Sequence, residues 1–237
     1  PLHTTDGIYW TAELELEVPQ EGMTINYSYQ IEQNGIVIRK EWDSFSRSIF
    51  LSGSSRKIYR INDCWKNIPE QLYLYSSAFT EALLAHPEKE NIPQSYKKGL
   101  VIKAYAPRIN KDYCLAICGN QKSLGHWDPE KAVLMSDTNF PEWQVELDAS
   151  KLKYPLEYKF ILYNKQEKKA DCWEKNPNRY LADPELKTNE TLVISDRYVY
   201  FDIPAWKGAG IAIPVFSLKS EKSFGVGDFG DLKRMVD

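Results

Sequence analysis

Two tryptophans and a lysine are the residues best suited to bind a ligand. Trp127 and Trp173 lie in the turn-rich, polar runs LGHWDPEKAV and DCWEKNPNRYL, and Lys159 lies between them in LEYKFILY. Such surroundings indicate exposed indoles, although Trp127 could instead cap a loop and Trp173 could pack on a sheet. The C–H groups of a sugar ring can stack on an indole face, and its hydroxyls then take charged or amide partners at the rim. The pattern favours a carbohydrate-binding platform.

Short strands are expected to position these residues. Residues 99–203 hold several strand-like runs separated by turn signals, which is typical of an antiparallel β-sandwich or barrel. In LEYKFILY the apolar residues alternate with Glu157 and Lys159, so Lys159 should face away from the core. Trp143 falls on the apolar face of WQVELDA and is expected to be a core residue.

The segment before the linker is also predicted to be all-β. YWTAELELEV alternates cleanly between apolar and polar residues, which predicts a half-buried strand. Asn34-Gly35 between two strand-like runs predicts a two-residue hairpin. We expect four parts: a first module over 1–66, a linker over 67–98, a second module over 99–203, and a different unit over 204–237.

The two β segments resemble copies of each other. Trp10 and Trp143, Tyr27 and Tyr158, and Trp42 and Trp173 are separated by nearly the same number of residues. Repeats of this length are whole domains rather than solenoid units. Nothing before Trp10 corresponds to the first two strands or to the Trp127 loop of the second copy, so the first copy is expected to lack its beginning.

The last stretch differs from both copies. It is expected to form a small-residue strand over Gly210–Leu218, a Gly-rich loop and a helix that starts at Asp231. A single strand–loop–helix unit cannot close a sheet, so we expect the chain to be part of a longer protein.

Composition excludes several function classes. The net charge of −3, with scattered Lys and Arg, argues against a nucleic-acid surface, and no apolar run is long enough to cross a membrane. The spacing of the cysteines and histidines matches no metal site, and no nucleophile–base set or phosphate loop is present. We expect no cofactor, and four free, buried thiols in a reducing compartment.

The second module resembles the family 20 starch-binding modules, over roughly residues 99–203. The motifs LGHWDPEKAV, PEWQVEL, LEYKFI and WEKNPNRYL occur in the family's order. The resemblance implies a small antiparallel β-sandwich that binds α-1,4-glucans. It also implies a main binding site made of Trp127, Lys159, Trp173, Glu174 and Asn178. The family also has a second glucan site, whose first tyrosine is expected at the position that Lys111 occupies in this chain. The resemblance therefore does not carry that site over.

The first segment looks like a degenerate copy of the same module. Trp42 and Asp43 would match Trp173 and Glu174 as a possible remnant of the binding site. The spacing that relates Tyr27 to Tyr158 puts Ser28 in place of the lysine and Arg47 in place of the asparagine. A structural role for Trp42 is therefore as well supported as a binding role.

The tail PVFSLKSEKSFGVGDFGDL resembles the opening of the family 77 4-α-glucanotransferases, the disproportionating-enzyme type. The resemblance implies the first β-α unit of a truncated (β/α)8 barrel that transfers glucosyl units by a retaining mechanism with two carboxylates. Those carboxylates would belong to later barrel strands. We therefore expect no catalytic residue in this chain and no activity of this part alone, and we take Asp231 as a helix N-terminal charge.

The leading interpretation is the glucan-binding part of a cytoplasmic 4-α-glucanotransferase. Its expected partners are maltooligosaccharides, starch or glycogen and its own C-terminal barrel, with no nucleic acid and no membrane. Two alternatives are a non-catalytic glycogen-binding scaffold and the binding region of another starch-active enzyme, such as an amylase. The tail favours the transferase, because a scaffold has no need of a barrel strand.

Overall fold

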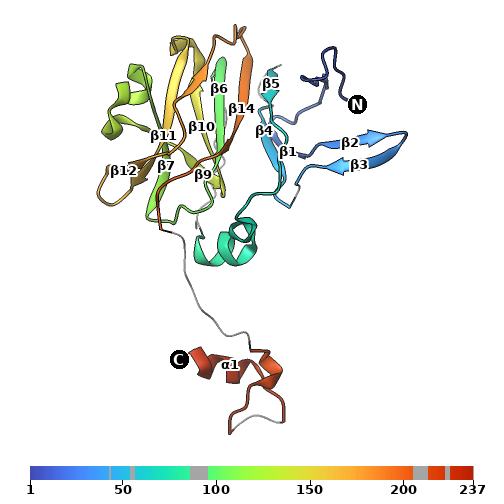
Figure 1. Ribbon diagram of the computed structural model, residues 1–237, viewed down its shortest axis with the longest axis vertical. Helices are drawn as coiled ribbons and strands as arrows, with labels where there is room; N and C mark the ends of the chain where they lie inside the picture. The colour runs from blue at the N-terminus through green and yellow to red at the C-terminus, as the bar shows by residue number, and fades with distance from the viewer. Residues whose placement is uncertain (43, 54–56, 86–95, 205–212, 222–224, 237) are drawn as a thin grey trace. The chain divides into compact units, whose positions relative to one another are not determined.

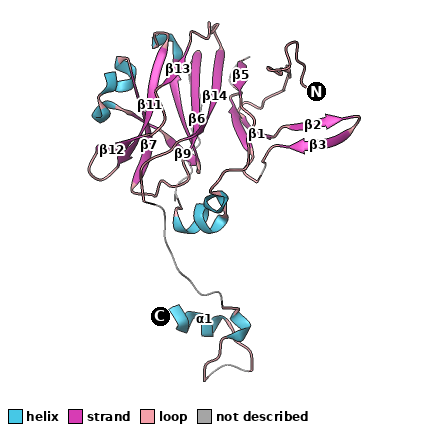
Figure 2. Ribbon diagram, viewed as in Figure 1, coloured by secondary structure: helices cyan, strands magenta, loops and turns pink. Residues whose placement is uncertain are grey.

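The computed structural model describes residues 1–42, 44–53, 57–85, 96–204, 213–221 and 225–236 (Figure 1). It divides the chain into a first unit, Pro1–Asp202, and a second unit, Ile203–Asp237. Strands predominate in the first unit (Figure 2). The boundaries expected after residues 66 and 98 both fall inside this first unit.

Two facing sheets make up the part of the first unit after residue 97. One has the strand order β5-β14-β6-β10-β9, in which β5 (Ile58–Asn62) comes from the first segment; the other has the order β12-β11-β7-β8, and β13 also pairs with β11. The strands of this part are β6 (Lys98–Tyr105), β7 (Tyr113–Gly119), β8 (Val133–Leu134), β9 (Ser136–Asn139), β10 (Glu142–Asp148), β11 (Leu156–Asn164), β12 (Lys169–Trp173), β13 (Arg179–Leu181) and β14 (Glu190–Tyr198). Because β14 runs parallel to both β5 and β6, the first sheet is mixed rather than purely antiparallel as expected.

The core between these sheets consists of alternating apolar residues from facing strands. Leu100 and Ile102 of β6 lie opposite Leu147 and Val145 of β10, and all four are buried. From the other sheet come Leu115, Ile117, Leu156, Tyr158, Phe160 and Leu162. Trp143 is fully buried and donates its indole N–H to the Ala106 carbonyl at 3.2 Å, which confirms its predicted core position.

The strands of the first segment do not form a second two-sheet sandwich among the described residues. They are β1 (Met23–Tyr27), β2 (Gln30–Gln33), β3 (Ile36–Lys40), β4 (Arg47–Leu51) and β5 (Ile58–Asn62). β1 pairs with β4, and β2 pairs with β3 around the predicted Asn34-Gly35 turn, where both residues have positive φ. β5 instead joins the sheet of the later part and lies beside β14.

The β1–β4 ribbon covers the outer face of that sheet (Figure 1). Ile49 and Leu51 of β4 form one apolar cluster with Val101 of β6 and Val193 of β14. Met23, Ile25, Tyr27, Tyr59 and Ile61 pack against this cluster. β6 and β14 therefore have apolar residues buried on both faces, and the first segment shares a core with the later part.

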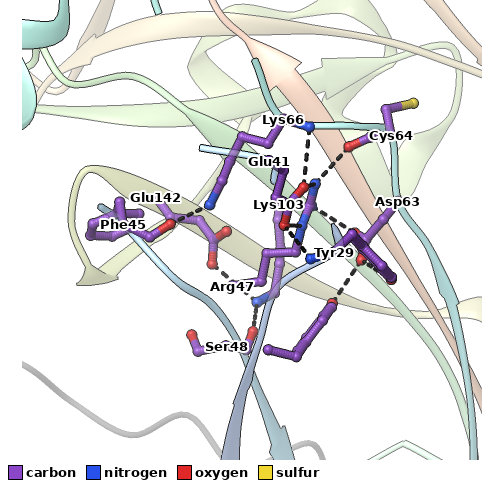
Figure 3. A network of polar contacts seen from close by, with 11 residues as sticks. Tyr29, Glu41, Phe45, Arg47, Ser48, Asp63, Cys64, Lys66, Lys103 and Glu142 are labelled. Atoms are coloured by element: carbon purple, nitrogen blue, oxygen red, sulfur yellow. Dashed lines mark hydrogen bonds and ion pairs between the residues drawn. The ribbon is translucent and has the colours of Figure 1, made fainter. Parts of the chain in front are cut away.

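A network of buried charges lies beside this apolar cluster (Figure 3). The Arg47 guanidinium makes two 3.0 Å hydrogen bonds to the Glu41 carboxylate and lies 3.1 Å from Asp63. Tyr27 and Tyr29 donate their hydroxyls to Asp63 at 2.8 and 3.0 Å. Lys103 of β6 pairs with Glu142 at 3.0 Å and donates to the Ser48 carbonyl of β4, so charged groups also connect the two parts of the first unit.

The predicted strand near the start is absent. Trp10, Leu14 and Leu16 are 57%, 81% and 50% exposed, and residues 12–19 have no regular structure. Among the described residues, the only ladder contact of this stretch is a bridge between His3 and Thr11. An alternating pattern can form a strand only where a neighbour supplies the backbone hydrogen bonds, and here none does.

Short helical turns connect the strands of the first unit: η1 (Leu72–Tyr75), η2 (Ala78–Leu83), η3 (Lys122–Trp127), η4 (Pro129–Lys131) and η5 (Ala149–Lys151). η1 and η2 fall in the predicted linker 67–98, whose residues 86–95 lie outside the described residues. No described helix is long and apolar enough to cross a membrane.

The second unit contains η6 (Val215–Ser217) and the helix α1 (Phe229–Val236). The strand expected over Gly210–Leu218 is not found: residues 210–212 lie outside the described residues, and Val215–Ser217 form a helical turn. The helix begins at Phe229, two residues before the expected start. Asp228 accepts from the Gly230 and Asp231 amides, and Asp231 accepts from the Asp228 amide, which makes a reciprocal N-terminal cap.

We predict that Arg47→Met lowers the free energy of unfolding by about 3–5 kcal/mol, because it leaves the buried Glu41 and Asp63 carboxylates unpaired. Urea unfolding followed by circular dichroism would measure this. The control is Arg60→Met, which removes a pair with Glu190 in which the arginine side chain is 42% exposed, and which should cost less than about 1 kcal/mol. Equal losses in the two variants would contradict the prediction.

Candidate functional site

The two predicted platform tryptophans lie side by side. The ring centroids of Trp127 and Trp173 are 6.2 Å apart and their planes are inclined by 48°. Both side chains are half-exposed. Trp173 ends β12 and lies opposite Ile161 of β11, on the outer face of the second sheet. Neither indole is sealed in the core, so the pair offers two inclined apolar faces to solvent.

The loop that carries Trp127 has an unusual backbone. Gly125, His126 and Trp127 have φ values of 78°, 53° and 62°. A bulky residue with positive φ is a true outlier, and such strain persists only where the surroundings enforce it. Here the His126 amide donates to the Gln121 carbonyl at 3.0 Å, and the buried Gln121 side chain makes two hydrogen bonds to the backbone of Lys153.

The far side of this loop is held by Asp128. Its amide donates to the Gly125 carbonyl at 2.9 Å, and its carboxylate accepts from the Glu130 amide and pairs with Lys131. Its carbonyl accepts a weak 3.5 Å hydrogen bond from the thiol of Cys118 on β7. Trp127 is thus fixed between two anchored loop segments.

Lys159 lies on the same face as Trp173. It is two residues from Ile161 along β11, so their side chains project to the same side of the sheet. The lysine is half-exposed, and within the described part of the chain its ammonium makes no hydrogen bond or ion pair. Its three donors are therefore available to a ligand beside the indoles.

Asn178 reaches the same face from the turn between β12 and β13. Its side-chain amide donates to the Glu157 carboxylate at 2.6 Å, and the Tyr180 hydroxyl donates to the same oxygen at 2.8 Å. These two hydrogen bonds, that from Asn178 first, lower the pKa of Glu157. The sequence analysis did not select Glu157 or Tyr180 as site residues. The alternation that placed Lys159 outward also places Glu157 outward.

Glu174 is not part of this surface, which corrects the expectation from the resemblance. Its side chain is fully buried and accepts from the Phe160 amide at 2.9 Å. The Arg179 guanidinium donates to both of its oxygens, at 3.3 and 2.9 Å. Glu174 is therefore a structural residue that fixes the turn after Trp173.

The same set of contacts occurs in the first segment. There Glu41 accepts two hydrogen bonds from Arg47 and one from the Tyr29 amide at 3.2 Å. The backbone matches as well, since the Glu41 amide donates to Tyr29 and the Glu174 amide donates to Phe160, both at 3.0 Å. Behind these pairs, Tyr27 donates to Asp63 as Tyr158 donates to Asp196.

This structural match revises the pairing inferred from spacing. If Glu41 corresponds to Glu174, the residue that corresponds to Trp173 is Lys40, not Trp42. Trp42 is only 8% exposed and packs edge-on against Tyr75, so its predicted role as a site remnant is wrong. Asp43 lies outside the described residues. Arg47 is a structural partner of Glu41 rather than a counterpart of Asn178.

Other kinds of site have little support. A pocket of about 260 Å³ lies away from the indoles and is lined by Lys98, Ala149, Ser150, Leu152, Tyr154, Asp183, Pro184, Glu185 and Leu186. The described residues contain no group of three or more His, Cys, Asp or Glu that could hold a metal ion. All four cysteines are free; Cys114 and Cys118 are buried as expected, but Cys64 is exposed and Cys172 is only partly buried, contrary to expectation.

Comparisons with known proteins match this part of the chain. Residues 101–193 match the family model of the starch binding domain. The chain is 26% identical, over 254 residues, to the 4-alpha-glucanotransferase DPE2 of Oryza sativa subsp. japonica; the match covers 100% of this chain and 26% of that protein. The chain thus spans about a quarter of the length of this relative.

Solved structures of an amylase module and of a glucoamylase are also similar. The family 20 CBM of the maltotetraose-forming amylase from Pseudomonas saccharophila STB07 is 19% identical with a TM-score of 0.34, over 41% of this chain and 99% of that one. The family 15 glucoamylase from Hypocrea jecorina is 22% identical with a TM-score of 0.36, over 49% of this chain and 19% of that one.

We predict that Gly125→Ala destabilises the Trp127 loop. The new Cβ would lie 2.8 Å from the Lys131 carbonyl oxygen, and the residue would keep a φ of 78° that alanine disfavours. The matched control is Gly35→Ala, which has a φ of 77° but no atom within 4 Å of the new Cβ. Both should lower the free energy of unfolding, by about 1 kcal/mol for Gly35 and by more for Gly125. Equal losses in urea unfolding would show that the close approach is harmless.

Proposed function

We propose that residues 99–203 bind α-1,4-glucans such as starch or glycogen through Trp127 and Trp173. The observation that carries the proposal is the pair of half-exposed indoles, 6.2 Å apart and inclined by 48°. The match of residues 101–193 to the starch binding domain supports it.

The geometry suits a curved glucan. Two consecutive glucose units of a helical α-glucan lie at an angle, so each can stack on one of two inclined rings. Lys159 donates to sugar hydroxyls, and the Asn178 amide lies on the same face. Each sugar–aromatic contact contributes on the order of 1 kcal/mol, so a two-ring site should bind in the rough range of micromolar to millimolar.

We propose further that the chain is the glucan-binding part of a cytoplasmic 4-α-glucanotransferase of the family 77 type. The alignment with the rice enzyme supports this, because it covers the second unit as well as the two β segments. The catalytic carboxylates would lie in a (β/α)8 barrel beyond this chain. The binding part would hold a polysaccharide near that barrel and raise the local concentration of substrate.

The first segment is, in this proposal, a second copy of the module that has lost its platform. The recurrence of the Glu41–Arg47 contacts around Glu174 and Arg179 supports a shared origin. Lys40 stands where Trp173 does, and Ser28 where Lys159 does, so the copy has no ring at the first position and no ammonium at the second. It contributes instead to the shared core.

We predict that Trp173→Ala and Trp127→Ala each abolish binding of β-cyclodextrin, a closed α-1,4-glucan, in isothermal titration calorimetry. Each variant removes one of the two stacking faces while leaving the core intact. The matched control is Trp10→Ala, which removes a 57% exposed indole elsewhere and should bind as the unchanged chain does. Binding that survives both platform variants would mean that the site lies elsewhere.

We also predict that this chain alone transfers no glucosyl units between maltose and glycogen. The reason is that the retaining reaction needs a nucleophilic carboxylate and an acid/base carboxylate around one bond, and we place both in the barrel. Product analysis by chromatography would test it. Turnover above a control without protein would disprove that placement.

A further inference from the structure

A row of polar and aromatic side chains continues the outer face beyond the two indoles. On β11, Ile161 lies opposite Trp173, and Glu157 lies opposite Tyr180 of β13. Residues directly opposite each other on paired strands project to the same face of the sheet. Every second residue along one strand also projects to the same face. Trp173, Lys159 and Tyr180 therefore lie on one face, in that order along β11.

The ring of Tyr180 is exposed to solvent, and its hydroxyl is held by a hydrogen bond. The residue is 70% exposed, and its hydroxyl donates to the Glu157 carboxylate, which also accepts from Asn178. Anchoring the hydroxyl restricts the ring before any ligand arrives, so less conformational freedom is lost on binding. The second carboxylate oxygen of Glu157 has no hydrogen-bond partner in the described part of the chain, so an acceptor stands next to an exposed ring.

The spacing separates Tyr180 from the indoles. Ile161 and Glu157 are four residues apart on β11, which corresponds to about 13–14 Å at about 3.4 Å per residue. A ligand confined to the two indoles ends short of Tyr180. A longer chain that runs along β11 past Lys159 reaches it.

We propose that Tyr180 and Glu157 form an additional sugar subsite that makes the platform selective for longer linear α-glucans. The ring of Tyr180 takes a further stacking contact, and the Glu157 carboxylate accepts from a sugar hydroxyl. This inference rests on the proposed function, because it requires that the indoles bind the start of the same glucan.

The test compares a short and a long ligand on the full chain, by titration of intrinsic tryptophan fluorescence with maltose and with maltoheptaose. Tyr180→Ala should weaken maltoheptaose binding about fivefold, which corresponds to about 1 kcal/mol, and leave maltose binding unchanged. Tyr180→Phe keeps the ring and should retain most of the maltoheptaose affinity. The matched control is Tyr9→Ala, because Tyr9 is 74% exposed but lies far from this face in the sequence and on no strand.

The outcomes separate the subsite from the proposed function. If Tyr180→Ala binds maltoheptaose as tightly as the unchanged chain does, the subsite is wrong and the platform stands. An equal loss for maltose and maltoheptaose also overturns the subsite, since Tyr180 would then act only by positioning the indoles. If the unchanged chain binds neither sugar, the proposed function and the subsite both fail.

Discussion

A buried glutamate–arginine pair determines how each β segment of this chain is arranged. Glu174 has no exposed side-chain surface, so its charge requires the Arg179 guanidinium and the Phe160 amide that surround it. Those bonds fix the residues on either side: Trp173 points outward just before the glutamate, and Asn178 lies just before the arginine. The same pair, Glu41 with Arg47, has no tryptophan beside it on that face. The buried glutamate–arginine pair can therefore occur with an outward tryptophan beside it, as at Glu174, or without one, as at Glu41.

The second constraint is the shared core. Ile49 and Leu51 cover Val101 of β6 and Val193 of β14, so these two strands of the first sheet are not available to solvent or ligand on their outer face. The other sheet keeps its outer face open, and there the loop with Trp127 and the row along β11 lie. The burial of β6 and β14 on one side therefore leaves the other sheet as the place for the proposed platform.

Much of this arrangement could be predicted from sequence. The alternation in LEYKFILY placed Lys159 outward, and turn-rich surroundings identified both indoles. Alternation of side chains would also place Glu174 inward, because it directly follows the outward-facing Trp173. The resemblance to the family's binding site led to the opposite expectation. The error over Trp42 came from a constant spacing, because the first copy has two fewer residues between Tyr29 and Glu41 than the second has between Phe160 and Glu174. The strand expected over YWTAELELEV does not form. An alternating pattern does not show whether a neighbouring strand is present to pair with it.

The parallel pairing of β5 with β14 has a consequence for how the chain folds. The two strands are neighbours in space, yet Ile58 pairs with Glu190, so nearly the whole first unit must be synthesised before this contact can form. Contacts between residues far apart in sequence slow folding, because the intervening chain must first lose its freedom. During synthesis on the ribosome, β5 cannot form its pairing with β14 until Glu190–Tyr198 have been added to the chain. The first unit should then complete its folding late and in one cooperative step, rather than segment by segment.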